Sequence, residues 1–183
     1  AWGALDKELE AIFTRTYGEK RKMPPEMNAA RRVSYDPAQK VEIKFREPVE
    51  EYLLVDGYNI IFAWEELNEL ARTTIDGARH KLMDILCNYQ GYKKCTLILV
   101  FDAYKVTGNI GQAIEYHNIH VVYTKEAETA DQYIEKLAHK MGRNHRVTVA
   151  TSDGLEQLII RGQGCHLMSA RDLKEEVDYV NQQ

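Results

Sequence analysis

Cysteine is scarce in this chain of 183 residues, and its three cysteines, Cys87, Cys95 and Cys165, lie far apart. No two of them form a CxxC pair, which argues against a zinc ribbon, and their odd number argues against a disulfide scaffold. We interpret them as small apolar residues of a core in a reducing compartment, and we therefore predict a cytoplasmic protein.

Long apolar runs and nucleotide-binding loops are also missing. The longest apolar stretches, such as KCTLILVF, are far shorter than the roughly 18 residues of a membrane span, so we predict no membrane partner. The sequence has no GxxxxGKS/T and no GxGxxG motif, which excludes nucleotide hydrolases and dinucleotide enzymes that use those phosphate cradles. The histidines are scattered, and the pattern supports no Ser-His-Asp triad.

Proline and basic residues are concentrated in one part of the chain. All four prolines lie within residues 19–48, and residues 20–46 hold eight basic and three acidic residues, an excess of +5. Residues 51–183 hold 14 basic and 19 acidic residues, a net charge of −5. We therefore predict two parts: residues 1–50 as an N-terminal helix, near residues 6–16, with a basic linker, and residues 51–183 as a globular domain. The basic linker is interpreted either as a solvated tether or as a contact for a polyanion.

From residue 51 onward, strand patterns alternate with helix patterns. Apolar runs predict strands near 52–55, 95–101, 119–123, 146–150 and 165–168. Amphipathic stripes predict helices over 75–89, 134–141, 155–159 and 170–180. Continuous apolar strands separated by helices are typical of a mostly parallel sheet covered on both faces. The predicted fold class is therefore α/β, with three layers and a central sheet of about five strands.

Four aspartates follow the predicted strands. Asp56, Asp102 and Asp153 come at or just after strand ends, and Asp131 begins the helix after the third strand, where Thr129 is its expected cap. A single aspartate in such a place is commonly a turn or cap residue. Four are expected to meet, because the carboxyl ends of parallel strands share one edge of the sheet. Crowded carboxylates repel one another unless a cation lies between them, and Mg²⁺ or Mn²⁺ with such ligands can promote phosphodiester cleavage.

Other side chains near this edge are candidates for substrate binding. Tyr58, Trp64 and Tyr104 could stack on unpaired bases, although core packing is the expected role of Trp64. The charged candidates could contact phosphate or pair with a carboxylate, and the small polar ones could bind phosphate, a metal-bound water or the local backbone. The candidates are Asn59, Tyr58, Arg79, Lys105, Thr151 and Ser152.

Residues 51–183 resemble the YacP-like branch of the NYN ribonuclease family, relatives of PIN and flap-nuclease domains. The matching segments are YLLVDGYNII, LVFDAYKVTG, VVYTKEAETADQYIEKL, VTVATSDGLEQ and MSARDLKEEV. The resemblance implies a PIN-like fold and a metal-dependent endoribonuclease that cleaves single-stranded RNA, in some members messenger RNA at the ribosome. It implies that the catalytic and metal-binding residues are Asp56, Asp102, Asp131 and Asp153, with Asn59 beside them.

The first 50 residues, especially ELEAIFTRTYGEKRK, resemble a different kind of segment. They are similar to the tail that joins a TetM-like translation GTPase, akin to elongation factor G, to a C-terminal NYN domain. This resemblance implies a C-terminal fragment of such a fusion, with the upstream GTPase domain as a partner.

Other proteins with a parallel sheet were weighed against this prediction. A receiver domain would need a lysine at a late strand end, and a haloacid-type phosphatase would need a DxD motif, whereas the first strand here ends in DGY. The remaining alternative is a catalytically inactive RNA- or ribosome-binding module with the same fold.

Overall fold

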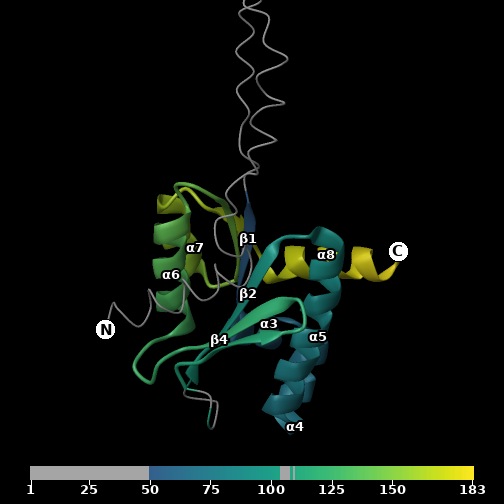
Figure 1. Cartoon of the computed structure of the whole chain (residues 1–183). Helices are drawn as coiled ribbons and strands as arrows, with labels where there is room; N and C mark the ends of the chain where they lie inside the picture. The colour runs from purple at the N-terminus through teal and green to yellow at the C-terminus, as the bar shows by residue number, and fades with distance from the viewer. Residues whose placement is uncertain (1–49, 104–107, 109) are drawn as a thin grey trace, which may run out of the picture. The chain divides into compact units, whose positions relative to one another are not determined.

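The computed structural model of the chain describes residues 50–103, 108 and 110–183 (Figure 1). The helix and basic linker predicted within residues 1–50 lie outside the described residues, as do Tyr104 and Lys105. None of the helices in the described part is long and apolar enough to cross a bilayer.

A six-stranded sheet in the order β3-β4-β2-β1-β5-β6 forms the centre of the fold. All neighbouring strands are parallel except β3 and β4, which are antiparallel. Its strands are β1 (Glu51–Asp56), β2 (Thr96–Phe101), β3 (Ala113–Tyr116), β4 (Ile119–Tyr123), β5 (Arg146–Ala150) and β6 (His166–Met168). The mostly parallel α/β prediction is confirmed, and the five predicted strands correspond to all of these except β3.

Helices cover both faces of the sheet. They are α3 (Gly57–Ala63), α4 (Glu65–Thr73), α5 (Ile75–Lys93), α6 (Ala130–Met141), α7 (Gly154–Gly162) and α8 (Ala170–Asn181). One core joins Leu53 and Val55 of β1 to α3, α4, α5 and α8, while α6 packs on the opposite face of β1, β2 and β5 with α7 beside it (Figure 1). Side chains alternate between the faces of a strand, so β1 supplies both cores and is buried at the centre of the sheet.

Helix α7 differs from its sequence-based prediction in the face that it buries. The amphipathic stripe that predicts a helix over 155–159 consists of Leu155, Leu158 and Ile159 and would pack inward, but these side chains are 70%, 68% and 36% exposed. The helix instead buries Glu156 and Ile160. The prediction of a helix is confirmed and that of its buried face is wrong, because the acidic Glu156 is held inside by tertiary contacts that periodicity does not reveal.

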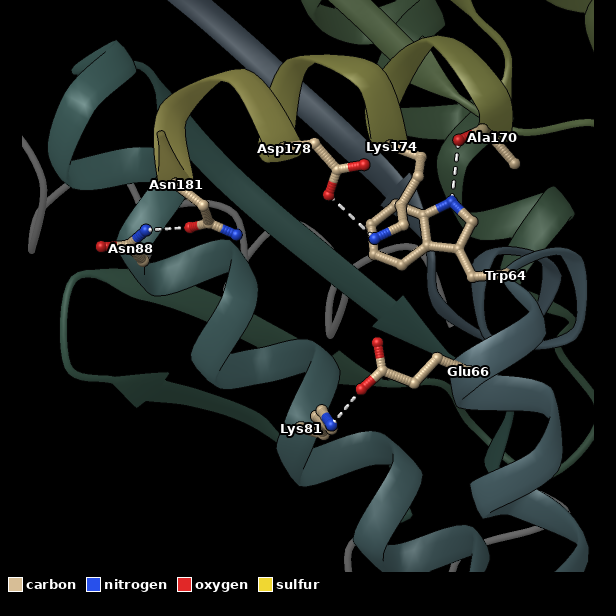
Figure 2. Close-up of polar contacts among 8 residues, drawn as sticks. All are labelled: Trp64, Glu66, Lys81, Asn88, Ala170, Lys174, Asp178 and Asn181. Carbon is tan, nitrogen blue, oxygen red and sulfur yellow. Dashed lines mark hydrogen bonds and ion pairs between the residues drawn. The ribbon is translucent and has the colours of Figure 1, made fainter. Parts of the chain in front are cut away.

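Helix α8 is attached to the helices below it through Trp64, which lies between α3 and α4 (Figure 2). The indole Nε1 donates a buried hydrogen bond of 2.8 Å to the carbonyl oxygen of Ala170, and the Lys174 ammonium lies 5.5 Å from the ring centroid. The Trp64 side chain is only 5% exposed. The structure therefore agrees with the expected packing role of Trp64, and its ring is not available to stack on RNA.

Replacing Trp64 by Phe should destabilise the fold by about 1–3 kcal/mol, because it removes the buried indole hydrogen bond to the Ala170 carbonyl and leaves the larger ring's space partly empty. Urea denaturation would measure this loss. The matched control is Lys81→Gln, which breaks the exposed Lys81–Glu66 ion pair and should cost less than about 1 kcal/mol. Equal losses in the two variants would contradict the role given to the indole hydrogen bond.

Candidate functional site

The candidate site lies at the carboxyl edge of the sheet, where the direction of strand addition reverses. The chain moves from β1 to β2 and β4 on one side, and then returns to place β5 on the other side of β1. Open α/β sheets bind their ligands beside such a reversal. Asp56 is the last residue of β1, and Thr151 and Asp153 directly follow the neighbouring β5.

Three carboxylates meet at this edge. Asp56, Asp131 and Glu156 each offer an oxygen, and these oxygens all lie within 4.8 Å of one another. Asp56 and Glu156 are 5% and 3% exposed, whereas Asp131, in the first turn of α6, is open to solvent. The cluster therefore has a buried side formed by two acids and one accessible acid facing outward.

Asp102 and Asp153 border this cluster. The charge of Asp102 raises the pKa of both Asp56 and Asp131, and that of Asp153 raises the pKa of Asp131. Oδ1 of Asp102 accepts a hydrogen bond of 2.6 Å from the Ala130 amide, which fixes the start of α6. Oδ1 of Asp153 accepts from the amides of Leu155 and Glu156 and caps α7. All four predicted aspartates thus lie around one site, and their catalytic roles remain predictions.

The two buried acids are strongly perturbed. Burial raises the pKa of Asp56 to about 7, with further contributions from the charges of Asp131 and Asp102. Burial and the charge of Asp56 raise the pKa of Glu156 to about 9. Burial also raises the pKa of Asp131, more than the charges beside it do. At neutral pH the metal-free pair therefore holds a proton between its two carboxyl groups, because burial and mutual repulsion disfavour two charges.

The ligand atoms of this cluster fit a hard divalent cation. Oε2 of Glu156 accepts a hydrogen bond of 2.9 Å from the Thr151 hydroxyl. Its other oxygen, Oε1, is buried and has no hydrogen-bond donor among the described residues apart from a proton shared with Asp56. A buried carboxylate oxygen beside two further carboxylates requires either protons or a cation, and Mg²⁺ and Mn²⁺ prefer oxygen ligands.

Glu156 was not predicted as a site residue. A signal for it exists in the sequence, because Asp153 and Glu156 are separated by three residues and so lie one turn apart at the start of a helix. The same spacing is that of a capping pair, which is the ordinary interpretation of such acids. Only the fold shows that Glu156 points inward toward Asp56.

The polar residues beside the cluster hold its backbone. Thr151 is fully buried: its hydroxyl donates to Glu156 and accepts from the Asp153 amide at 3.2 Å. The prediction that Thr151 contacts phosphate is therefore wrong. The hydroxyl bonds instead to the local backbone at Asp153, which was the alternative. Oδ1 of Asn59 accepts from the Ser152 amide at 2.7 Å, and Oγ of Ser152 accepts from the Ala170 amide at 2.9 Å.

The expected roles of Tyr58 and Arg79 also need correction. Tyr58 is 4% exposed and its ring packs against Phe62 and Phe101, so it cannot stack on a base. Arg79 is also buried, donates to the Tyr58 hydroxyl at 3.1 Å and forms an ion pair with Asp76. Of the two roles considered for Arg79, pairing with a carboxylate is the one observed.

Replacing Asn59 by Ala should weaken the binding of Mn²⁺ by about 10-fold or more, because residues that orient metal ligands typically have effects of this size. The bond from Asn59 holds the loop that carries Thr151 and hence Glu156. The midpoint of Mn²⁺-dependent thermal stabilisation would measure the change. Asn59→Asp, which keeps an acceptor for Ser152, should restore most of the loop geometry, and an unchanged midpoint in Asn59→Ala would rule out the positioning role.

Residues 53–183 match the model of the YacP-like NYN domain. This chain belongs to that family. It is 43% identical over 129 residues to "Uncharacterized protein YacP" of Bacillus subtilis (strain 168), an alignment that covers 70% of this chain and 75% of that protein.

Two crystal structures of Rae1 (YacP) from Bacillus subtilis share the fold of this YacP-like domain. One superimposes with a TM-score of 0.63 at 42% identity and covers 72% of this chain and 75% of that one. The other, of a mutant form of the same protein, also gives a TM-score of 0.63, at 41% identity, with 72% and 77% coverage. The predicted family and PIN-like fold are thereby confirmed. The fusion to a translation GTPase, inferred from residues 1–50, remains a prediction.

Proposed function

We propose that this YacP-like domain is a metal-dependent endoribonuclease that cleaves single-stranded RNA by attack of water on a phosphodiester bond. The observation that carries this proposal is the cluster of Asp56, Asp131 and Glu156, whose buried Glu156 Oε1 has no donor among the described residues other than a proton shared with Asp56, in a domain with a PIN-like nuclease fold. A bound Mg²⁺ or Mn²⁺ would supply an activated water and stabilise the leaving oxygen.

Each carboxylate has a distinct part in this proposal. Asp56 and Glu156 would hold the cation from the buried side, and Thr151 orients Glu156 through its hydroxyl. Asp131 is accessible, so it can contact both the cation and a water on the solvent side, and its raised pKa suits it to accept a proton. Asp102 and Asp153 extend the negative edge around the cation and hold the first turns of α6 and α7 in place.

Two helices also favour an anionic substrate at this edge. Both α6 and α7 begin beside the cluster, so their amino-terminal ends carry partial positive charge toward it. The buried Tyr58 cannot stack on a base, and Lys105 remains a candidate phosphate contact.

Messenger RNA at the ribosome is the more specific substrate that we propose. A cytoplasmic location and an upstream GTPase domain are further predictions.

The decisive experiment incubates the full chain with a labelled unstructured RNA in EDTA, in Mg²⁺ and in Mn²⁺. Cleavage is expected only with a divalent ion, and it should be lost in Asp56→Asn. The matched control is Asp178→Asn, which removes an exposed carboxylate that pairs with Lys174 and should leave cleavage unchanged. Binding of RNA without metal-dependent cleavage would instead support an inactive RNA- or ribosome-binding module.

A further inference from the structure

We infer that the opposite, amino end of the sheet is a second RNA-binding surface, which contacts phosphates several nucleotides away from the one that is cut. This inference rests on the proposed ribonuclease function. Its basis is the placement of charge in the fold. The surface is formed by Lys93, Lys94, Lys140, Arg143, Arg146 and Arg161, and we call it the basic end.

The basic end is built by the segments that lead from helices back into parallel strands. Residues 88–95, 137–146 and 159–166 lie at the ends of α5, α6 and α7 that precede β2, β5 and β6, on the side where β1 begins (Figure 1). Together these segments hold six Lys or Arg residues and no Asp or Glu, in a chain whose net charge is −4. All six side chains are exposed.

Few acids counter this charge. Glu50 and Glu51 enter β1 at the same end, where Glu51 lies 3.4 Å from Arg146 and Glu50 lies 3.9 Å from His145. Within the described part of the chain, Lys94 and Arg143 form no ion pair. Glu176 of α8 also reaches this end, where its carboxylate accepts a hydrogen bond from the Tyr89 hydroxyl. Six basic residues against three acidic ones leave an excess of +3 at this end, while the carboxyl end gathers Asp56, Asp102, Asp131, Asp153 and Glu156.

Helix dipoles explain only part of this pattern. A cation in the last turn of a helix is stabilised by the unpaired carbonyl groups there, and this accounts for Lys93, Lys140 and Arg161. It does not account for Arg143, which lies in the loop after α6, or for Arg146, which begins β5. Lys94 caps α5 in a left-handed conformation with φ of 60°, where Gly or Asn would be the usual residue.

A hollow in the same surface can receive part of a polyanion. Its volume is about 220 Å³, and its walls include Lys93, Arg146, His166 and the single acid Glu51, with Leu53 and Met168 also lining it. Typical pockets for small ligands are larger, at about 300–1,000 Å³. The hollow therefore fits a phosphate and its neighbouring sugar on a longer chain better than a complete cofactor.

The distance between the two ends sets the geometry of binding. Strand β1 runs from Glu51 at the basic end to Asp56 at the acidic site, so the two ends are about 17 Å apart at a rise near 3.3 Å per residue. A phosphate at the basic end is therefore not the scissile one. An acidic cleft repels RNA in the absence of metal, and cationic contacts elsewhere would supply the affinity that the cleft lacks.

The test measures binding of a labelled unstructured RNA to the full chain in EDTA, over a series of KCl concentrations. Each phosphate neutralised on a single strand contributes about 0.7 to the slope of log affinity against log salt. Lys94→Glu/Arg143→Glu should therefore lower the slope by about 1.4 and weaken binding by on the order of tenfold at about 0.1 M salt. Lys94→Gln/Arg143→Gln should give an intermediate loss, and circular dichroism would confirm that both variants fold.

The matched control is Arg72→Glu/Arg171→Glu, which makes the same change of net charge at exposed positions on α4 and α8. Arg72 also lies in a last helical turn, so it controls for the dipole. This control should bind RNA within about twofold of wild type. If it loses as much affinity as Lys94→Glu/Arg143→Glu, the loss is an effect of net charge alone and the inference is overturned. If the Lys94 and Arg143 variants lose binding to phosphatidylserine vesicles but still bind RNA as tightly as wild type, RNA is not the partner of this surface.

Cleavage distinguishes failure of this inference from failure of the proposed function. At saturating RNA, the single-turnover rate of Lys94→Glu/Arg143→Glu should equal that of wild type, because the acidic site is unchanged. If wild type cleaves and the variant binds as tightly as wild type, only the second surface is wrong. If wild type shows no metal-dependent cleavage but the binding losses occur as expected, only the nuclease function is wrong.

Discussion

Asp56→Asn should abolish RNA cleavage and make the metal-free protein more stable. The side chain is central to the cluster and 5% exposed, so its loss should lower the cleavage rate by at least about 10²-fold. An amide of the same shape removes a buried charge that burial and the neighbouring carboxylates disfavour. In EDTA at about pH 8, we expect the variant to be about 1–3 kcal/mol more stable than wild type.

Two measurements on the same preparations check this result. Urea denaturation in EDTA gives the free energy of unfolding, and cleavage of labelled RNA in Mn²⁺ gives the activity. Asp178→Asn, at an exposed position on α8, should change neither. A destabilised Asp56→Asn protein would mean that Asp56 has a structural role, and retained cleavage would place the metal elsewhere.

The strands of this fold could be predicted because each carries a strong local signal. β1, β2 and β4 are continuous apolar runs buried in the sheet. A short apolar run of this kind has few possible structures other than a buried parallel strand. β3 was missed because its four residues, Ala113–Tyr116, are only partly buried at the edge. The turn that joins it to β4 places His117 at a φ of 50°, and because this residue is not glycine, the sequence gives no clear signal of the turn.

The helices α3 and α4 were missed for a different reason. The chain passes from Asp56 directly into α3, and a Cβ on Gly57 would lie 2.3 Å from the Phe101 ring, so the turn depends on a contact between distant residues. Trp64 then separates two short helices at an extended residue. The turn at Gly57 and the break at Trp64 have no periodic signal, whereas α4 does have a helical period in Leu67, Leu70 and Ala71, which the sequence-based prediction overlooked.

The acidic edge of the site could be inferred from topology alone, but its interior could not. Strand ends place Asp56 and Asp153 near one another in any parallel sheet of this order. Glu156 and Thr151 belong to the site because α7 turns its Leu155 side outward and its Glu156 side inward. That choice is made by the bond from Thr151, which is local, together with packing against α6 and the contact with Asp56, which involve residues far apart in the sequence.

The second large effect expected is a loss of stability with rising pH in the metal-free protein. The unfolded chain releases the protons of Asp56 and Glu156 near their ordinary pKa values, whereas the folded protein keeps them up to about pH 7 and about pH 9. The folded state thus binds more protons over this range, so the free energy of unfolding falls as pH rises and levels off above the folded pKa values. Between about pH 6 and pH 9, the loss from this pair should be on the order of 5 kcal/mol.

Glu156→Gln isolates this contribution, because Gln has the same shape, can accept from the Thr151 hydroxyl and can donate to Asp56 without a titrating proton. The variant should match wild type at about pH 5 and exceed it in stability at about pH 8, both in EDTA. Glu69→Gln, at an exposed position on α4, should follow the wild-type curve. Mn²⁺ should stabilise wild type more at about pH 8 than at about pH 6, since the cation competes with the shared proton. If stability falls with pH equally in wild type and in Glu156→Gln, the buried pair does not bind the proton. A cation would then have no proton to replace between Asp56 and Glu156.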